Sequence, residues 1–230
     1  MKITAVIFDL FGTLVDEFAS SVGQMNLELA TALDVPMEPF MRLWRETAEM
    51  RTNGAFQTVE DSIEHVCRIL GAQITEEQMT QAVAIRLRYT RHALKPRPDA
   101  VETLAQIKDQ GYKLGLLSNC SIEIPILWPE TALANLIDEA IFSSRERLSK
   151  PDPRIYHLIS ARLQVAPENC LYIADGENYE LRAGAALGMR VILIRTPGRQ
   201  LVGEVLREAR EWHGQTIAAL REVTKLVGME

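Results

Sequence analysis

A short apolar run that contains a single carboxylate, VIFDLFGTL at residues 6–14, constrains the fold of this chain more than any other feature. Its first three residues are all apolar, which indicates a strand buried on both faces and therefore a parallel sheet covered on both sides. Gly12 follows closely and can open a tight loop, because glycine adopts backbone conformations that other residues avoid. This geometry predicts that Asp9 lies at the carboxyl edge of the sheet, where open α/β folds bind ligands.

The second half of the chain alternates apolar strands with helical patterns, which is typical of a parallel sheet with crossover helices. One helix follows Pro98 and ends near Gly111, another starts at Pro153, and a third ends near Gly188. In the C-terminal tail only residues 220–227 have a helical pattern. The sequence therefore predicts an α/β fold with a doubly wound, Rossmann-like parallel sheet. Its expected strands after the first are 113–118, 140–144, 171–175 and 191–194.

Residues 16–94 differ, since they have no convincing strand and show helical periodicity instead. An apolar stripe marks one helix, and Thr75 with Gln78 forms a capping box at the start of another. At 230 residues the chain suits one domain with a large insertion or two modest domains, and we predict a helical insertion after the first strand. The alternative is a separate helical domain that does not act as a lid. The stripe consists of Ile63, Val66, Cys67 and Leu70.

Charge and composition argue against several classes of function. The 25 basic residues are outnumbered by 31 acidic ones, a formal net charge of -6, whereas nucleic-acid partners require basic patches. No run approaches the ~18 apolar residues of a membrane span, and no secretory cleavage site is visible. Cys67, Cys120 and Cys170 are widely spaced, so neither a disulfide framework nor a zinc site is expected. We expect a cytoplasmic protein that binds a small molecule, with no nucleic-acid or membrane partner.

Three further segments carry polar residues at or beyond strand ends, in a fixed order. LGLLSNCS delivers Ser118, SKPDPRIY carries Lys150, and LYIADGENYEL delivers Asp175. Together with Asp9 this set resembles the haloacid dehalogenase (HAD) superfamily of hydrolases, over roughly residues 5–195. The motifs of that superfamily are D-x-D-x-T, a serine or threonine, a lysine, and one or two acids.

The resemblance extends to the domain plan, because an insertion at this point is an α-helical cap that closes over the active site. It implies a HAD-like hydrolase core of residues 1–15 and 95–230 and a cap of residues 16–94. The cap is rich in arginine, and guanidinium groups suit phosphate or carboxylate groups on a substrate. On resemblance, Arg45 and Arg51 are the candidates for substrate binding. Both a monomer and a homodimer remain open.

Asp9 is the expected nucleophile, since a carboxylate can attack phosphorus or an alkyl carbon and pass the covalent ester to water. Lys150 would neutralise Asp9 and the transferring group. Ser118 would donate a hydrogen bond to a non-bridging oxygen, and Asn119 offers a backbone amide beside it. We therefore expect Asp9, Ser118 and Lys150 to be catalytic and Asn119 to contact the substrate.

A dianionic phosphoryl group repels a carboxylate, so a phosphatase built on Asp9 needs a cation. Hard oxygen ligands on Asp9 and Asp175 suit Mg²⁺. The family resemblance implies that the backbone carbonyl of Phe11 is a third ligand. The expected cofactor is therefore Mg²⁺, held by these three residues.

Two positions depart from the family pattern. Where the phosphatases carry a second aspartate as general acid and base, this chain has Phe11, and loss of such an acid typically removes about 10² to 10⁴ in rate. We therefore expect slow turnover of poor leaving groups, or a substrate whose leaving group needs little protonation, such as an acyl phosphate or a halide. A further family aspartate is replaced by Tyr179, which leaves open whether Glu177 or Glu180 completes the metal site.

These departures leave three interpretations. We favour a Mg²⁺-dependent phosphatase that acts on a small phosphorylated metabolite through an aspartyl-phosphate at Asp9, because Asp175 beside it is costly without a cation. The first alternative is a metal-independent 2-haloacid dehalogenase-like hydrolase, which Tyr156, six residues after Lys150, favours and Asp175 disfavours. The second is a catalytically weakened binding or regulatory protein of the same fold. A phosphonoacetaldehyde hydrolase is set aside, because residues 16–94 contain no lysine for its Schiff base.

Overall fold

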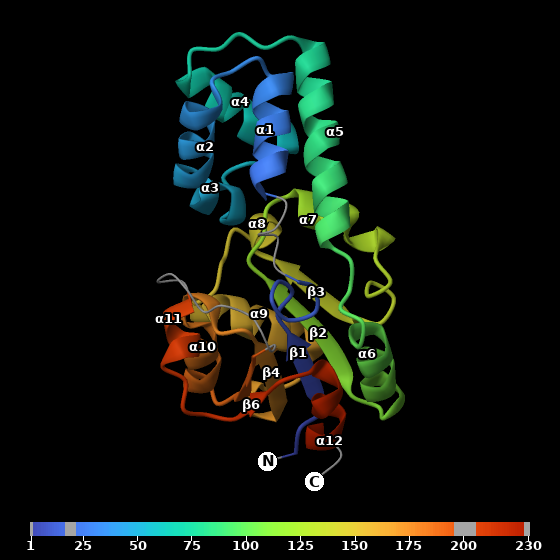
Figure 1. The fold of residues 1–230 in the computed structure, drawn as a ribbon. Coiled ribbons are helices and arrows are strands. Elements are labelled where there is room, and N and C mark those ends of the chain that lie inside the picture. The colour runs from blue at the N-terminus through green and yellow to red at the C-terminus, as the bar shows by residue number, and fades with distance from the viewer. Residues whose placement is uncertain (1, 17–21, 196–205, 228–230) are drawn as a thin grey trace.

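The computed structural model describes residues 2–16, 22–195 and 206–227. A parallel sheet in the order β3-β2-β1-β4-β5-β6 forms its centre (Figure 1). This arrangement confirms the doubly wound α/β fold predicted from the sequence. The strands are β1 (Ala5–Phe8), β2 (Lys113–Ser118), β3 (Glu139–Phe142), β4 (Cys170–Ala174), β5 (Arg190–Ile194) and β6 (Thr216–Ile217).

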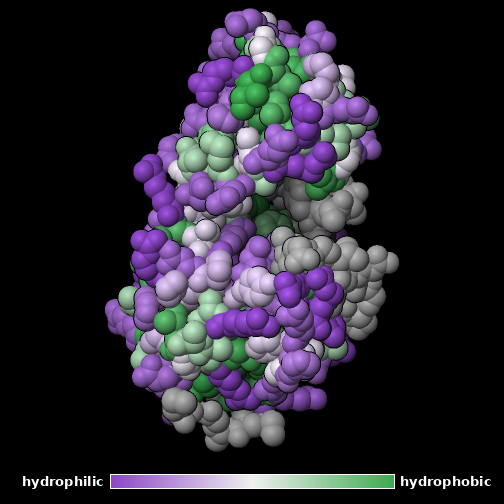
Figure 2. Space-filling view, turned by 90° about the vertical axis from the view of Figure 1, so that its left-hand side faces the viewer, coloured by the Kyte–Doolittle hydropathy of each residue, from purple (hydrophilic) through white to green (hydrophobic). Residues whose placement is uncertain are grey.

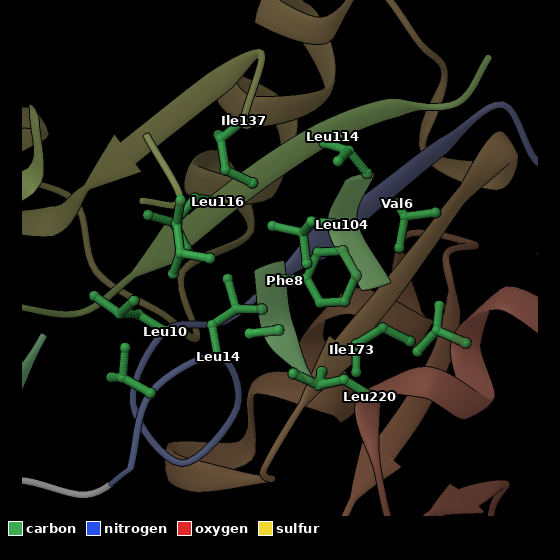
Figure 3. Packing of buried hydrophobic residues seen from close by; sticks show 14 of the residues in the cluster. Val6, Phe8, Leu10, Leu14, Leu104, Leu114, Leu116, Ile137, Ile173 and Leu220 are labelled. Atoms are coloured by element: carbon green, nitrogen blue, oxygen red, sulfur yellow. The ribbon is translucent and has the colours of Figure 1, made fainter. Parts of the chain in front are cut away.

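Helices cover both faces of the sheet, which is why β1 is apolar at every position. Val6 and Phe8 point into one hydrophobic cluster, and Ala5 and Ile7 point into the other. Figure 3 shows Phe8 within the first cluster, close to Leu104. On that face lie α6 (Ala100–Asp109), η6 (Leu220–Glu222) and α12 (Val223–Val227), and on the other lie α9 (Pro153–Leu163), α10 (Glu180–Ala186) and α11 (Arg207–Arg210).

Short helices connect the strands at the edges of the sheet. They are α7 (Glu123–Leu127), η2 (Trp128–Glu130), α8 (Ser143–Glu146), η3 (Pro167–Asn169) and η4 (Glu177–Tyr179). Two of them lie beyond the carboxyl ends of strands: α7 follows β2, and α8 follows β3. They therefore stand between the sheet and the helices inserted after β1.

The inserted helices form a cap with a hydrophobic cluster of its own. Phe40 and Trp44 stack within it at 5.5 Å between ring centroids. The predicted capping box of Thr75 and Gln78 is present at the start of α5. The helices of this cap are α1 (Val22–Ala32), α2 (Met37–Glu46), α3 (Ala48–Thr52), α4 (Val59–Ile69) and α5 (Glu76–Ala93).

The two crossings between core and cap lie side by side. Val15 and Pro96 form an isolated antiparallel bridge, and the Arg97 amide donates to the Leu14 carbonyl at 2.9 Å. The cap also touches the core through α3 against α8 and α5 against α7. The division at residues 15/16 and 94/95 remains a prediction, although the paired crossings agree with it.

Three details differ from the expectations. The strand predicted at 140–144 is Glu139–Phe142, because Ser143 already opens α8. Neither α11 nor β6 was predicted, because neither is long enough to show a hydrophobic periodicity. Helix α10 begins at Glu180 rather than directly after Asp175. Among the described residues, no helix combines the length and the apolar character that crossing a membrane requires.

Candidate active site

Strand order and register bring three of the predicted residues to one edge of the sheet. β1 lies between β2 and β4, with Phe8 aligned to Leu116 and to Ile173. Asp9 directly follows β1, Ser118 ends β2, and Asp175 directly follows β4. All three residues are at least 95% buried, and the edge coincides with the point where the strand order reverses.

Lys150 reaches this edge from the segment between α8 and α9. The side chain of Asn119 holds that segment: its Nδ2 donates to the Lys150 carbonyl at 2.9 Å, and its Oδ1 accepts from the Lys150 amide at 2.8 Å. The sequence predicted Asn119 as a substrate contact through its backbone amide, which stays a prediction. The structure adds a role that sequence reasoning missed, namely that the Asn119 side chain fixes the backbone that carries the lysine.

The Lys150 ammonium group lies between two carboxylates. Its Nζ donates to Asp9 Oδ1 at 2.6 Å and to Glu180 Oε2 at 2.5 Å. Burial by itself would lower the pKa of Lys150, but the negative charges of Asp9 and Glu180 raise it well above the ordinary lysine value. The lysine is therefore protonated, and it can neutralise charge on Asp9.

Glu180 connects Lys150 to Tyr172 and to the turn after β4. Its Oε2 also accepts from the Tyr172 hydroxyl at 2.6 Å, and its Oε1 accepts from the backbone amides of Gly176 and Glu177, each at 3.1 Å. Both carboxylate oxygens are thus engaged by hydrogen bonds, and the residue is completely buried. Glu180 positions Lys150 and the turn after β4, and it has little capacity left for a further ligand.

Two left-handed residues shape the turn that precedes Glu180. Asn178 and Tyr179 have φ values of 53° and 59°, so the chain loops once more before α10 begins. The short helix η4 is therefore interrupted at Asn178, and the regular helix α10 begins only at Glu180. Tyr172 was also missed, although a tyrosine inside an apolar strand was a signal that its hydroxyl needs a buried partner.

Three buried carboxylates cluster at this edge, and the Lys150 ammonium group contacts two of them, Asp9 and Glu180. Oxygen atoms of Asp9, Asp175 and Glu180 all lie within 4.8 Å of one another. Burial raises the pKa of Asp9, Lys150 opposes that rise, and the charge of Asp175 adds to it. Burial likewise raises the pKa of Glu180 well above the ordinary value. With these groups ionised, two negative charges remain uncompensated, which a divalent cation would balance.

The donor atoms fit such a cation. Asp9 Oδ2 is buried and has no hydrogen-bond partner within the parts of the chain that the structure describes. Asp9 and Asp175 can therefore turn hard oxygen atoms toward one ion, as the sequence predicted. Glu180 lies close to both but is already engaged, so it supports the site through Lys150.

A pocket opens above the nucleophile. Phe11 lines it, which places an aromatic side chain where a phosphatase of this type would carry an acid. Arg45 is not among its lining residues and lies exposed on α2, and Ser118 is fully buried at the end of β2. Their predicted roles remain predictions. The pocket is lined by Asp9, Phe11, Asn119, Lys150, Glu177, Asn178 and Glu180.

Comparison with known proteins agrees with this geometry. Residues 3–188 match the haloacid dehalogenase-like hydrolases. The chain belongs to that family. A phosphatase of Mycobacterium tuberculosis is 30% identical to this HAD-like hydrolase over 213 residues, which cover 89% of this chain and 93% of the relative. An (S)-2-haloacid dehalogenase of Pseudomonas fluorescens is 28% identical over 205 residues, which cover 84% of this chain and 85% of the relative.

The solved structures show the same fold. The HAD phosphatase from Thermococcus onnurineus superimposes with a TM-score of 0.68 at 22% identity and covers 100% of this chain and 99% of its own. The curated relatives are divided between phosphatases and 2-haloacid dehalogenases at similar identity. Family membership therefore establishes that the protein is a HAD-like hydrolase. It does not distinguish phosphate hydrolysis from dehalogenation, so that choice must be argued from the side chains of the site.

Proposed function

We propose that this HAD-like hydrolase is a Mg²⁺-dependent phosphatase that acts on a small phosphorylated metabolite through an aspartyl-phosphate at Asp9. The observation that carries the proposal is Asp175, whose buried carboxylate lies within 4.8 Å of those of Asp9 and Glu180. Such a cluster is unfavourable beside a single ammonium group unless a cation joins it. Asp9, Asp175 and the Phe11 carbonyl would hold Mg²⁺, which would supply positive charge to the phosphoryl oxygens.

Asp9, Lys150 and Ser118 have different roles in this reaction. The Asp9 carboxylate attacks phosphorus, the leaving group departs with the bonding electron pair, and water then hydrolyses the acyl phosphate to regenerate Asp9. Lys150, held by Glu180 and Asn119, stays on Asp9 and offsets the negative charge of the transferring group. Ser118 at the end of β2 would donate to a non-bridging oxygen.

Phe11 limits which substrates react quickly. It lines the pocket two residues after the nucleophile and has no proton to give. A leaving group that departs as a stable anion needs no such proton, whereas an alkoxide does. We therefore infer that acyl or aryl phosphates are turned over faster than simple alkyl phosphates.

The dehalogenase alternative rests on Phe11 and on the relatives with that activity. Tyr156 weakens it, because its hydroxyl donates to the backbone carbonyl of Glu180 at 2.9 Å and the residue does not line the pocket. Asp175 weakens it further, since dehalogenation at Asp9 uses no cation to offset this charge.

One experiment separates the alternatives. Hydrolysis of 4-nitrophenyl phosphate is measured with Mg²⁺, with EDTA and in Asp9→Asn, alongside chloride release from L-2-chloropropionate. Phosphate release that needs Mg²⁺ and Asp9 is the expected result. Metal-independent chloride release would instead assign the protein to the dehalogenases. Silence in both assays, together with no covalent labelling of Asp9 in a single turnover, would favour a binding or regulatory role.

A further inference from the structure

Arg51 occupies a distinctive place at the boundary between cap and core. It lies in α3, the cap helix that contacts α8 of the core (Figure 1). The face of the molecule on which α2 and α3 lie is hollowed between the two lobes (Figure 2). The side chain of Arg51 is only partly buried, so part of it is accessible to a ligand.

The guanidinium group of Arg51 is held in place without a negative partner. It stacks over the Trp44 ring at 4.2 Å and donates from Nη1 to Thr47 Oγ1 at 2.9 Å. Across residues 2–16, 22–195 and 206–227, no ion pair joins Arg51 to a carboxylate. Four other cap arginines do have such partners, namely Arg42, Arg86, Arg88 and Arg91.

A second guanidinium group explains why a carboxylate is lacking. Arg86 faces the same Trp44 ring at 5.0 Å and donates from Nε and Nη2 to Glu123 Oε1 at 2.8 and 2.5 Å. Glu123, whose negative charge also acts on Arg51, is thereby paired with another cation. Burial and then the charge of Arg86 lower the pKa of Arg51 to about 10, against the opposing pull of Glu123. The buried Arg86 and the partly buried Arg51 have only one carboxylate, Glu123, between them, which leaves a positive charge that an anion would balance.

The same short segment borders both this cation and the catalytic pocket. Asn119 lines the pocket, and Glu123, which interacts electrostatically with Arg51, follows four residues later. We propose that Arg51 binds a second oxyanion at the end of the substrate remote from the group that reacts at Asp9. This inference rests on the proposed function and narrows it to phosphorylated acids or bisphosphates, because the planar guanidinium fork matches either oxyanion.

The kinetic test compares substrates that differ at that remote end. Carboxymethyl phosphate carries a carboxylate where 2-hydroxyethyl phosphate carries a hydroxymethyl group, and ethylene bisphosphate carries a second phosphate there. Wild type is expected to prefer one of the two oxyanion substrates. Arg51→Gln should reduce kcat/KM for that substrate by roughly 10- to 100-fold, the usual range for a lost hydrogen bond to a charged group.

Two controls isolate the effect. Hydrolysis of 4-nitrophenyl phosphate, which has no second oxyanion, should change by less than about twofold in Arg51→Gln, which also verifies folding. Arg42→Gln removes an exposed arginine of the same cap and should change neither assay. Equal loss on all substrates, or no loss on any, would overturn the inference.

A binding measurement tests the oxyanion site independently of whether the protein is a phosphatase. In the Asp9→Asn background, calorimetric titration with carboxymethyl phosphate and Mg²⁺ needs no turnover. Weaker binding on addition of Arg51→Gln, with unchanged binding of 2-hydroxyethyl phosphate, supports the oxyanion site even if aryl phosphate is not hydrolysed. Unchanged binding of carboxymethyl phosphate and of ethylene bisphosphate refutes it.

Discussion

Replacement of Glu123 by Gln is expected to lower the free energy of unfolding by roughly 3–5 kcal/mol, because it leaves Arg86 buried beside a neutral amide. The magnitude follows from burial: the two residues are 5% and 1% exposed, and Arg86 donates two hydrogen bonds to one carboxylate oxygen. The pair joins α5 of the cap to α7 of the core, and the adjacent Ile122 packs against the hydrophobic cluster of the cap. Loss of the pair therefore weakens the attachment of the cap.

Thermal unfolding followed by circular dichroism measures this effect. For a chain of this size the loss corresponds to a decrease in Tm of roughly 6–20 °C. Glu130→Gln is the matched control, because Glu130 pairs with Arg91 of the same helix α5 across the same boundary but both side chains are about half exposed. That variant should leave Tm nearly unchanged.

The effect should also depend on pH. Burial alone would raise the pKa of Glu123, but the charge of Arg86 brings it below the ordinary value of 4.5. A carboxyl group whose pKa is lower in the folded state stabilises above its unfolded pKa, and this stabilisation is lost as the pH falls. The difference between wild type and Glu123→Gln should therefore be full above about pH 4.5 and shrink below it.

Two outcomes would refute the reasoning. A Tm for Glu123→Gln as close to wild type as that of Glu130→Gln would mean that burial does not strengthen this ion pair. The double variant Arg86→Met with Glu123→Leu should recover most of the loss, since it removes both charges together. Additive losses in the double variant would show that packing, rather than charge, accounts for the single-site effect.

Three further predictions concern the site and the cap. Phe11→Asp should raise hydrolysis of alkyl phosphates by up to about 10²-fold, measured by phosphate release, and no gain with intact metal binding would contradict the role assigned to position 11. Glu180→Gln should reduce kcat by roughly 10- to 100-fold while calorimetric Mg²⁺ affinity changes little, because its oxygens already serve Lys150, Tyr172 and two backbone amides. Gly54→Ala should cost about 1–2 kcal/mol in urea unfolding, because φ is +80° and the new Cβ would lie 2.7 Å from a carbonyl oxygen of α8; Gly23→Ala, with open space around it, should not destabilise.

Much of the fold was predictable because its signals are local. An apolar run such as VIF indicates a doubly buried strand, and such strands require a parallel sheet with helices on both faces. Once Asp9 and Asp175 each follow a strand of that kind, the common direction of the strands places both at one edge. The sequence therefore determined the core, the cap insertion and the meeting of these two acids.

Only the tertiary structure decided which polar groups meet away from the strand ends. Arg45 and Arg51 lie in the same arginine-rich stretch of the sequence. Arg45 is nevertheless exposed, whereas Arg51 is partly buried and stacks on the Trp44 ring. Glu180 contacts Lys150 after a turn in which two residues adopt left-handed conformations, which no periodicity predicts. Periodicity records which side of an element is buried, whereas these contacts depend on how the cap and the strand-edge loops pack against one another, and no local pattern encodes that packing.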